Sequence, residues 1–192
     1  MTEVDGQPVI AFATVADCEA WYEQHHADHQ GFWLKIAKGE HAGSTIGYPE
    51  GLDVALCFGW IDGQKKSLDD AYWLQRFTRR GARSKWSEVN RGKATALIAR
   101  GAMRPAGLAE VERARADGRW DAAYSGSRTS TVPDDLAAAL DADPEAKAFF
   151  ATLSSANRYA ILYRVADAKR AETRAARIAK FVEMCHNHET VL

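Results

Sequence analysis

The sequence predicts an α+β fold: a small, mainly antiparallel sheet of three or four strands with helices in the N-terminal part, followed by a helical C-terminal part. Three observations lead to this prediction. Short segments rich in aromatic and branched residues end at about Thr78. Beyond Thr78, apolar residues recur at the three- and four-residue spacing of helices. A polar stretch, Ser125–Pro133, interrupts this helical part of the chain.

The first elements are a strand, a helix and a second strand. Pro8–Ala13 has the composition of a short strand, and Thr14 with Asp17 resembles a capping box that begins a helix. Phe32–Ala37 alternates and is rich in aromatic and branched residues, so a second strand is expected there. One face of the intervening helix carries Cys18, Trp21, Tyr22 and His25.

A second helix and two more strands follow. Pro49–Phe58 is expected to be helical, because proline is favoured in the first turn of a helix and Gly59 is a typical helix end. A strand is then expected to start near Trp60. Asp69–Asp70 marks a turn, and Tyr72–Thr78 is the next strand.

The rest of the chain is predicted to be helical. The expected helices are Ser87–Arg100, Pro105–Ala116 (with Leu108 and Val111 facing inward), Asp134–Leu140, Pro144–Leu153, Ser154–Ala168 and Ala171–His186. We expect an α+β domain over 1–124, a linker over 125–132 and a helical region over 133–192 that packs on the first domain.

Charge is distributed unevenly along the chain. Residues 1–59 carry 2 basic and 9 acidic side chains, although the whole chain has a net charge of −1. There are two basic blocks: residues 60–93 carry 9 basic and 4 acidic side chains, and residues 157–192 carry 7 basic and 4 acidic ones. The basic blocks can either form an anion-attracting patch or pair with the acidic N-terminal part, and both interpretations stay open. The net charge near zero argues against a nucleic-acid partner.

Cysteine and histidine patterns predict neither a disulfide framework nor a metal site. Cys18, Cys57 and Cys185 are widely spaced, and His25 with His29 lacks a third ligand. No cofactor is expected. The N-terminus does not resemble a signal peptide and no long apolar stretch occurs, so a soluble cytoplasmic protein without a membrane span is expected.

The strongest candidate for anion binding is a group of basic residues, because guanidinium groups form paired bonds to carboxylate and phosphate. This group is Arg76, Arg79, Arg80, Arg83 and Lys85. Tryptophans flank it, although Trp60 and Trp73 also suit a core. The candidate ligand-binding residues are Trp60, Asp62, Lys66, Arg76, Ser84, Trp86, Ser87, Asn90, Arg119, Arg174 and Arg177.

Two groups could instead carry chemistry. Asp62 could pair with Lys66 or Arg76, or orient these cations toward a ligand. Cys57 could act as a nucleophile, but its apolar neighbours favour a buried thiol. Arg170 and Arg174 are like charges four residues apart, which a bound anion or a partner carboxylate could offset, but the pattern favours a solvated basic helix face.

Several motifs resemble the bacterial YdeI/OmpD-associated family, often labelled bacteriocin-protection proteins. They are GFWLKIAK (Gly31–Lys38), LDVALCFGWIDGQKKSLDD (Leu52–Asp70), WLQRFT and SKWSEVN (within Trp73–Asn90), GRWDAAY (Gly118–Tyr124) and AKRAETRAARI (Ala168–Ile178). The family usually has Pro where this chain has Arg79, and Ala where it has Gly51. The resemblance implies protection against peptide antibiotics or envelope stress. It implies no reaction and supplies no catalytic residues.

Three functions therefore compete. The first is a non-catalytic protein of the bacteriocin-protection or stress type that binds a small anionic or peptide ligand. The second is an enzyme of unknown class that uses Asp62 or Cys57. The third is a nucleic-acid-binding module that uses the basic blocks. The expected partner is an unidentified small molecule or peptide, and a homodimer is left open.

Overall fold

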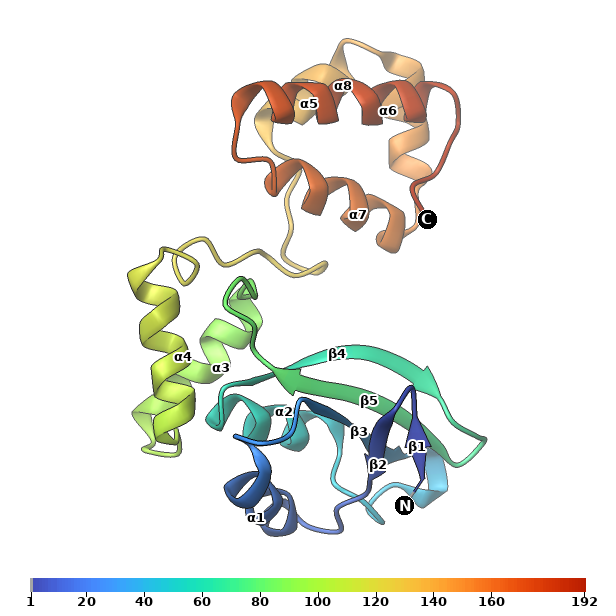
Figure 1. The fold of residues 1–192 in the computed structure, drawn as a ribbon. Helices are drawn as coiled ribbons and strands as arrows, with labels where there is room; N and C mark the ends of the chain where they lie inside the picture. The colour runs from blue at the N-terminus through green and yellow to red at the C-terminus, as the bar shows by residue number, and fades with distance from the viewer. Residues whose placement is uncertain (1) are drawn as a thin grey trace. The chain divides into compact units, whose positions relative to one another are not determined.

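The computed structural model describes residues 2–192, which divide into two compact units (Figure 1). The N-terminal unit comprises residues 2–86 and 90–123, and the C-terminal unit comprises residues 87–89 and 124–192. The first unit combines helices with a sheet and the second is helical, so the predicted α+β fold class is confirmed. The packing of one unit on the other stays a prediction.

The sheet of the N-terminal unit is mixed and has five strands within the described residues. Its strands lie in the order β1, β2, β3, β5, β4. The β2–β3 pair is parallel and the other three pairs are antiparallel. The strand bounds are β1 Glu3–Val4, β2 Gln7–Ile10, β3 Gly31–Ala37, β4 Trp60–Ser67 and β5 Tyr72–Arg79. The fifth strand, β1, is two residues long, too short to show the alternation by which strands are found in a sequence.

Helices α1 (Val15–His25) and α2 (Tyr48–Cys57) cover one face of this sheet (Figure 1). That face carries Phe32, Leu34 and Phe77, all buried in the main apolar core. Strand alternation places these three side chains on the same side, because Phe32 is paired with Phe77 and Leu34 lies two residues further along β3. The predicted capping box begins α1, and proline lies in the first turn of α2.

Strand β4 contains a bulge between Asp62 and Lys65. The buried amide of Gln75 fills the gap in the hydrogen bonding there, because its Nε2 donates to the carbonyl of Gly63 at 2.9 Å and to that of Gln64 at 3.2 Å. A bulge of this kind increases the twist of a strand pair. The bulge lies where β4 changes from buried and half-buried residues (Trp60 to Asp62) to exposed ones.

Helix α3 (Glu88–Ala99), from Asn90 onward, and helix α4 (Pro105–Ala116) complete this unit. Lys93 of α3 forms an ion pair with Asp53 of α2 at 2.7 Å. Helix α4 packs tightly against the end of α2, since a Cβ atom added at Gly107 would lie 2.2 Å from the carbonyl oxygen of Cys57. Only glycine allows the two helices to approach so closely.

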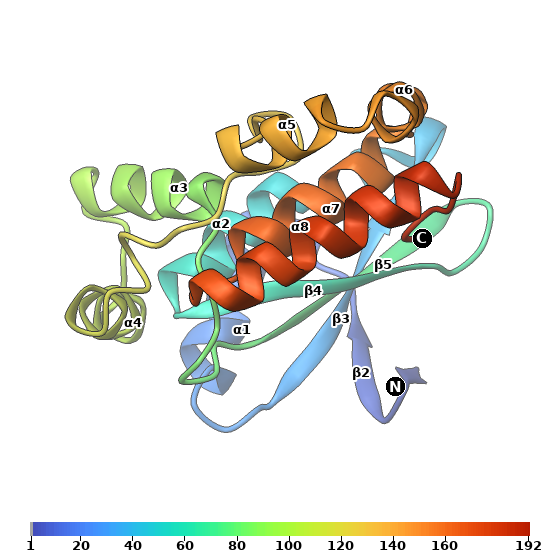
Figure 2. The same cartoon turned by 90° about the horizontal axis from the view of Figure 1, so that it is seen from above.

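The C-terminal unit is a bundle of four helices in which α8 contacts the other three (Figure 2). Their bounds are α5 Asp134–Asp141, α6 Pro144–Thr152, α7 Ser155–Ala166 and α8 Ala171–His186. Leu136, Phe150, Ile161 and Phe181 lie in its own apolar core. No helix within residues 2–192 combines the length and apolar character needed to cross a bilayer.

Candidate functional site

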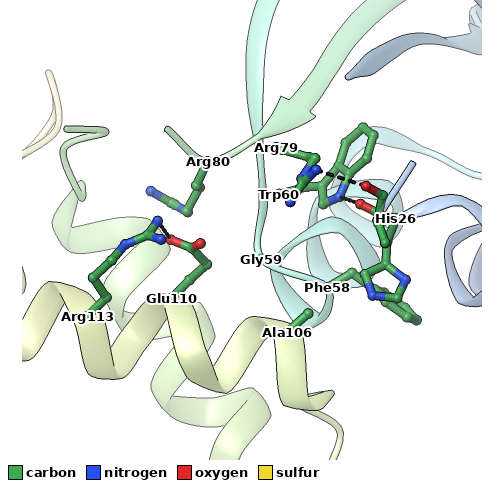
Figure 3. A pocket seen from close by; sticks show the side chains of 10 residues that line it. His26, Phe58, Gly59, Trp60, Arg79, Arg80, Ala106, Glu110 and Arg113 are labelled. Carbon is green, nitrogen blue, oxygen red and sulfur yellow. Dashed lines mark hydrogen bonds and ion pairs between the residues drawn. The ribbon is translucent and has the colours of Figure 1, made fainter. Parts of the chain in front are cut away.

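Four segments of the N-terminal unit surround a cavity of about 220 Å³ (Figure 3). They are the end of α1, the junction between α2 and β4, the end of β5 and one face of α4. The cavity is lined by His26, Ala27, Phe58, Gly59, Trp60, Arg79, Arg80, Ala106, Glu110 and Arg113. With a neutral histidine, three arginines and one glutamate give this lining a formal charge of +2, which favours anionic groups.

Gly59 forms the floor of this pocket, where the chain turns from α2 into β4. Its φ of 76° lies in the left-handed region that glycine adopts without steric cost. A Cβ atom there would lie 2.8 Å from Cγ of Glu110 and 2.9 Å from the carbonyl oxygen of Ala106. The missing side chain therefore sets both the turn and the approach of α4.

Arg79 contributes a guanidinium group from the last residue of β5. Its Nη1 donates to the carbonyl of Ala27 at 2.9 Å, which holds the side chain beside the end of α1 (Figure 3). The indole Nε1 of Trp60 donates to the neighbouring carbonyl of His26 at 3.2 Å. Since a carbonyl carries no net charge, the positive charge of Arg79 is not neutralised by this bond.

Helix α4 presents Ala106, Glu110 and Arg113 to the pocket, at the spacing that places residues on one helix face. The Glu110 carboxylate and the Arg113 guanidinium form an ion pair (Figure 3). The Glu110 side chain is 17% exposed and that of Arg113 is 44% exposed. The carboxylate thus lies in the wall of a pocket whose other charged side chains are cationic.

Arg80 is the most buried of the three arginines, at 5% exposed. Burying a charge is costly unless other groups replace its hydration. Its guanidinium carbon lies 3.6 Å from the ring centroid of Trp86, and Nη1 donates to the carbonyl of Lys85 at 3.3 Å. The indole face and the carbonyl therefore offset part of the cost, and the side chain keeps a fixed position in the pocket wall.

His26 is oriented by its own helix. Its Nδ1 lies 2.8 Å from the carbonyl of Tyr22, and because a carbonyl can only accept, Nδ1 carries the proton. His25 and His29 pack against Trp21, with ring centroids 5.1 and 5.4 Å from it. Within residues 2–192, no group of three or more His, Cys, Asp or Glu side chains could hold a metal ion.

The tryptophans expected at a ligand surface lie in the core. Trp60 and Trp86 are each 1% exposed. Trp60 is buried but still contributes to the pocket wall, and Trp86 lies against the guanidinium group of Arg80. Trp86 also packs edge-on against Trp120, with centroids 4.9 Å apart. Trp60 and Trp86 are therefore core residues and do not form an exposed ligand surface.

The expectation that Asp62 pairs with Lys66 or Arg76 is wrong. Its carboxylate accepts from the Tyr48 hydroxyl at 2.9 Å and from Nδ2 of the buried Asn90 at 3.4 Å. Asp62 is paired with a residue next to Arg76 on β5, so alternation directs the two side chains to opposite faces of the sheet.

The cations once expected beside Asp62 have other partners. Lys66 forms an ion pair with Asp5 at 2.5 Å, and Nη1 of Arg76 donates to Oε1 of Gln64 at 3.1 Å. Both contacts lie away from the pocket lining.

Ser84, Ser87 and Arg119 also lie outside the pocket lining. Arg119 forms an ion pair with Asp117 at 2.7 Å, and its Nη1 donates to the carbonyl of Ser84 at 2.7 Å. The Ser84 hydroxyl accepts from the backbone N–H of the Gly81 turn at 3.0 Å. Ser87 forms an isolated bridge with Tyr124. These contacts shape the loop before α3.

Arg174 and Arg177 lie in the C-terminal unit. Arg174 binds both carboxylate oxygens of Asp135, at 2.5 and 2.8 Å, and donates to the carbonyl of Val165 at 2.9 Å. Arg177 donates to the carbonyl of Arg164. The carboxylate beside Arg174 thus comes from Asp135 of the same chain, and both arginines donate to carbonyls at the C-terminal end of α7.

Burial makes Cys57 a poor nucleophile. The residue is 6% exposed, and burial raises the pKa of its thiol to about 11. Burial likewise raises the pKa of Cys18 to about 12. The reactive thiolate is therefore a very small fraction of either group near neutral pH.

The sequence indicated part of the pocket and missed the rest. Arg79 and Arg80 belong to the basic group singled out for anion binding, whereas His26, Glu110 and Arg113 were not connected with it. The helical spacing of Glu110 and Arg113 was the available signal. The expected inward position of Leu108 is wrong, since this side chain is 36% exposed.

The fold and the pocket define a protein of two units whose N-terminal, sheet-containing unit holds a small cationic pocket. The chain belongs to the family described as "Domain of unknown function (DUF8412)", whose model matches residues 10–110 and hence more than half of the chain. Residues 129–188 match the family described as "Bacteriocin-protection, YdeI or OmpD-Associated". No curated protein and no solved structure matches the chain.

The second match confirms the YdeI/OmpD-associated resemblance for the C-terminal region, where the AKRAETRAARI motif lies. It suggests a protein of the bacteriocin-protection type. The motifs between Gly31 and Asn90 fall within the other family model. The pocket residues up to Glu110 therefore lie in the family of unknown function.

Proposed function

We propose that this chain is a binding protein of the bacteriocin-protection type that holds a small anionic or peptide ligand in the pocket of its N-terminal unit, without catalysis. The observation that carries this proposal is the convergence of three guanidinium groups from two separate segments on one cavity of about 220 Å³. Guanidinium groups bind carboxylate and phosphate through charge-assisted hydrogen bonds, which are stronger than neutral ones.

The size of the pocket limits the ligand. Water occupies about 30 Å³ per molecule in the liquid, so the cavity has the volume of about seven waters. Pockets for drug-sized molecules span about 300–1,000 Å³. A small metabolite or the end of a peptide fits this space, whereas a helix or a folded partner does not.

The two rival functions gain less from the geometry. An enzyme based on Cys57 would need a thiolate that burial disfavours, and Asp62 accepts hydrogen bonds from Tyr48 and Asn90. A nucleic-acid surface would need cations free to reach phosphates along a strand. Lys66, Arg119 and Arg174 are instead paired with carboxylates of the chain.

Calorimetric titration of the full chain tests the proposal. The ligands would be inorganic phosphate, acetate, free amino acids and short peptides. For any ligand that binds, the affinity of the protein should fall about tenfold or more when Arg79 or Arg113 is replaced by Gln. The reason is that a hydrogen bond to a charged group contributes about 1.5–3 kcal/mol.

Arg83→Gln is the matched control, since Arg83 is an exposed arginine of the next loop and lies outside the pocket lining. Its replacement removes the same charge but should leave the affinity within about twofold. The ligands are titrated up to about 10 mM, which is on the order of the weakest dissociation constant of interest. If no ligand of the panel binds at that concentration, the proposed function is rejected. Equal losses in the control and the pocket variants would reject the pocket as the site.

A further inference from the structure

We infer that the pocket takes a zwitterion, an amino acid or the end of a short peptide, whose carboxylate binds Arg79 and whose ammonium group binds Glu110. This inference rests on the proposed function and names the class of its ligand. It starts from a feature that a plain anion site does not explain. Glu110 places a carboxylate in the wall of a pocket whose other charged side chains are the cations Arg79, Arg80 and Arg113.

The charges of the pocket are separated in space. Arg79 lies at the end of β5 beside the end of α1, and the Glu110–Arg113 ion pair lies across the cavity on α4 (Figure 3). The lining as a whole attracts anions, but of its charged side chains only the Glu110 carboxylate is negative. The same carboxylate attracts an ammonium group, so a ligand with both charges uses both ends of the pocket.

The position of Glu110 is set by the backbone around it. Glycine at position 59 leaves the space through which the side chain of Glu110 passes, since an added Cβ would lie 2.8 Å from its Cγ. Arg113 pairs with the carboxylate from the same helix and holds it in place. Glu110 thus reaches the cavity as a carboxylate held by its neighbours rather than as a mobile surface side chain.

The wall between the two charged ends is apolar. It is formed by Phe58, Trp60 and Ala106, together with the side-chain-free Gly59. An aliphatic side chain placed there leaves water for an apolar surface, which contributes about 25 cal/mol per Å² of buried area. Leucine is therefore a suitable probe, because it carries an ammonium group, a carboxylate and an aliphatic side chain.

Calorimetric titration of the full chain with four probes tests the inference. Leucine has both charges, N-acetyl-leucine keeps the carboxylate, leucinamide keeps the ammonium group, and inorganic phosphate is a plain anion. Leucine should bind about tenfold or more tightly than either blocked form, since each block removes one charge-assisted hydrogen bond.

Two substitutions should have opposite effects on the blocked probes. Glu110→Gln should weaken leucine binding about tenfold while N-acetyl-leucine binds as before or more tightly. Arg79→Gln should weaken leucine and N-acetyl-leucine alike while leucinamide is unchanged. Glu112→Gln is the matched control, because Glu112 is an exposed carboxylate on the same helix outside the pocket. Thermal unfolding of each variant verifies that it is folded.

The outcomes separate this inference from the proposed function. If phosphate or N-acetyl-leucine binds as tightly as leucine and Glu110→Gln does not weaken leucine, the pocket is a plain anion site and the inference is overturned. If none of the four probes binds, the inference fails, and the wider ligand panel then decides the proposed function. The inference that the ligand is a zwitterion is supported if Glu110→Gln weakens leucine but not N-acetyl-leucine, and Arg79→Gln weakens both of these but not leucinamide.

Discussion

Replacing Gly59 by Ala should destabilise the N-terminal unit strongly. Gly59 has a φ of 76°, and the left-handed region costs a residue with a side chain about 1–2 kcal/mol. The new methyl group would also lie 2.9 Å from the backbone oxygen of Ala106, which cannot turn away as a flexible side chain would. Overpacking of this kind costs about 1–3 kcal/mol. The expected total loss is about 2–5 kcal/mol.

Urea unfolding followed by tryptophan fluorescence measures this loss. All six tryptophans lie in the N-terminal unit, so the signal reports this unit alone. With a urea dependence of about 2 kcal/mol per M, the midpoint should fall by roughly 1–2.5 M. Gly92→Ala is the control, since Gly92 lies in α3 with no atom within 4 Å of the added Cβ. Its midpoint should stay the same or rise, because alanine favours helix. An unchanged midpoint for Gly59→Ala would refute the role assigned to this glycine.

Three further predictions concern helix packing, thiol reactivity and acid stability. Gly107→Ala should lower the same midpoint at least as much as Gly59→Ala, because its Cβ would lie 2.2 Å from a backbone oxygen of α2, and an equal midpoint to wild type would contradict this packing. The pKa values of the Cys18 and Cys57 thiols are raised to about 12 and about 11, so both should resist alkylation at neutral pH until urea unfolds the protein. Rapid labelling of Cys57 in the folded chain would contradict this and make Cys57 a candidate nucleophile again. The hydrogen bonds from Arg174 hold the pKa of Asp135 below the ordinary value of 3.8, so the stabilisation from this pair is complete above that value and is lost as the pH falls further. Arg174→Gln should lower the stability of the C-terminal unit at neutral pH and reduce its loss in acid, as measured by hydrogen exchange; an unchanged acid dependence would count against the pair.

Local sequence signals determined most of the secondary structure of this protein. The capping box of Thr14 and Asp17, the proline of the first turn of α2 and the glycine at position 59 each act within a few residues, so their effect is visible in the sequence. Alternation and helical spacing likewise indicated the central strands and the C-terminal helices. The two-residue β1 was missed, because its pairing with β2 depends on the neighbouring strand rather than on its own pattern.

The pocket could be predicted from the sequence less well than the secondary structure, because it depends on tertiary contacts. The sequence marked Arg79 and Arg80 as anion-binding candidates because their residue type already carries the chemistry. It could not join them to Glu110 and Arg113, since contacts between α4 and the end of β5 arise only when the chain folds. Nor could it place Asp62, because the face on which its side chain lies follows from its register with β5. The sequence alone thus determined which elements form and which side chains could bind an anion. The tertiary structure decided which of them share a cavity, because Gly59 and Gly107 let α4 approach the end of α2 and complete the pocket wall.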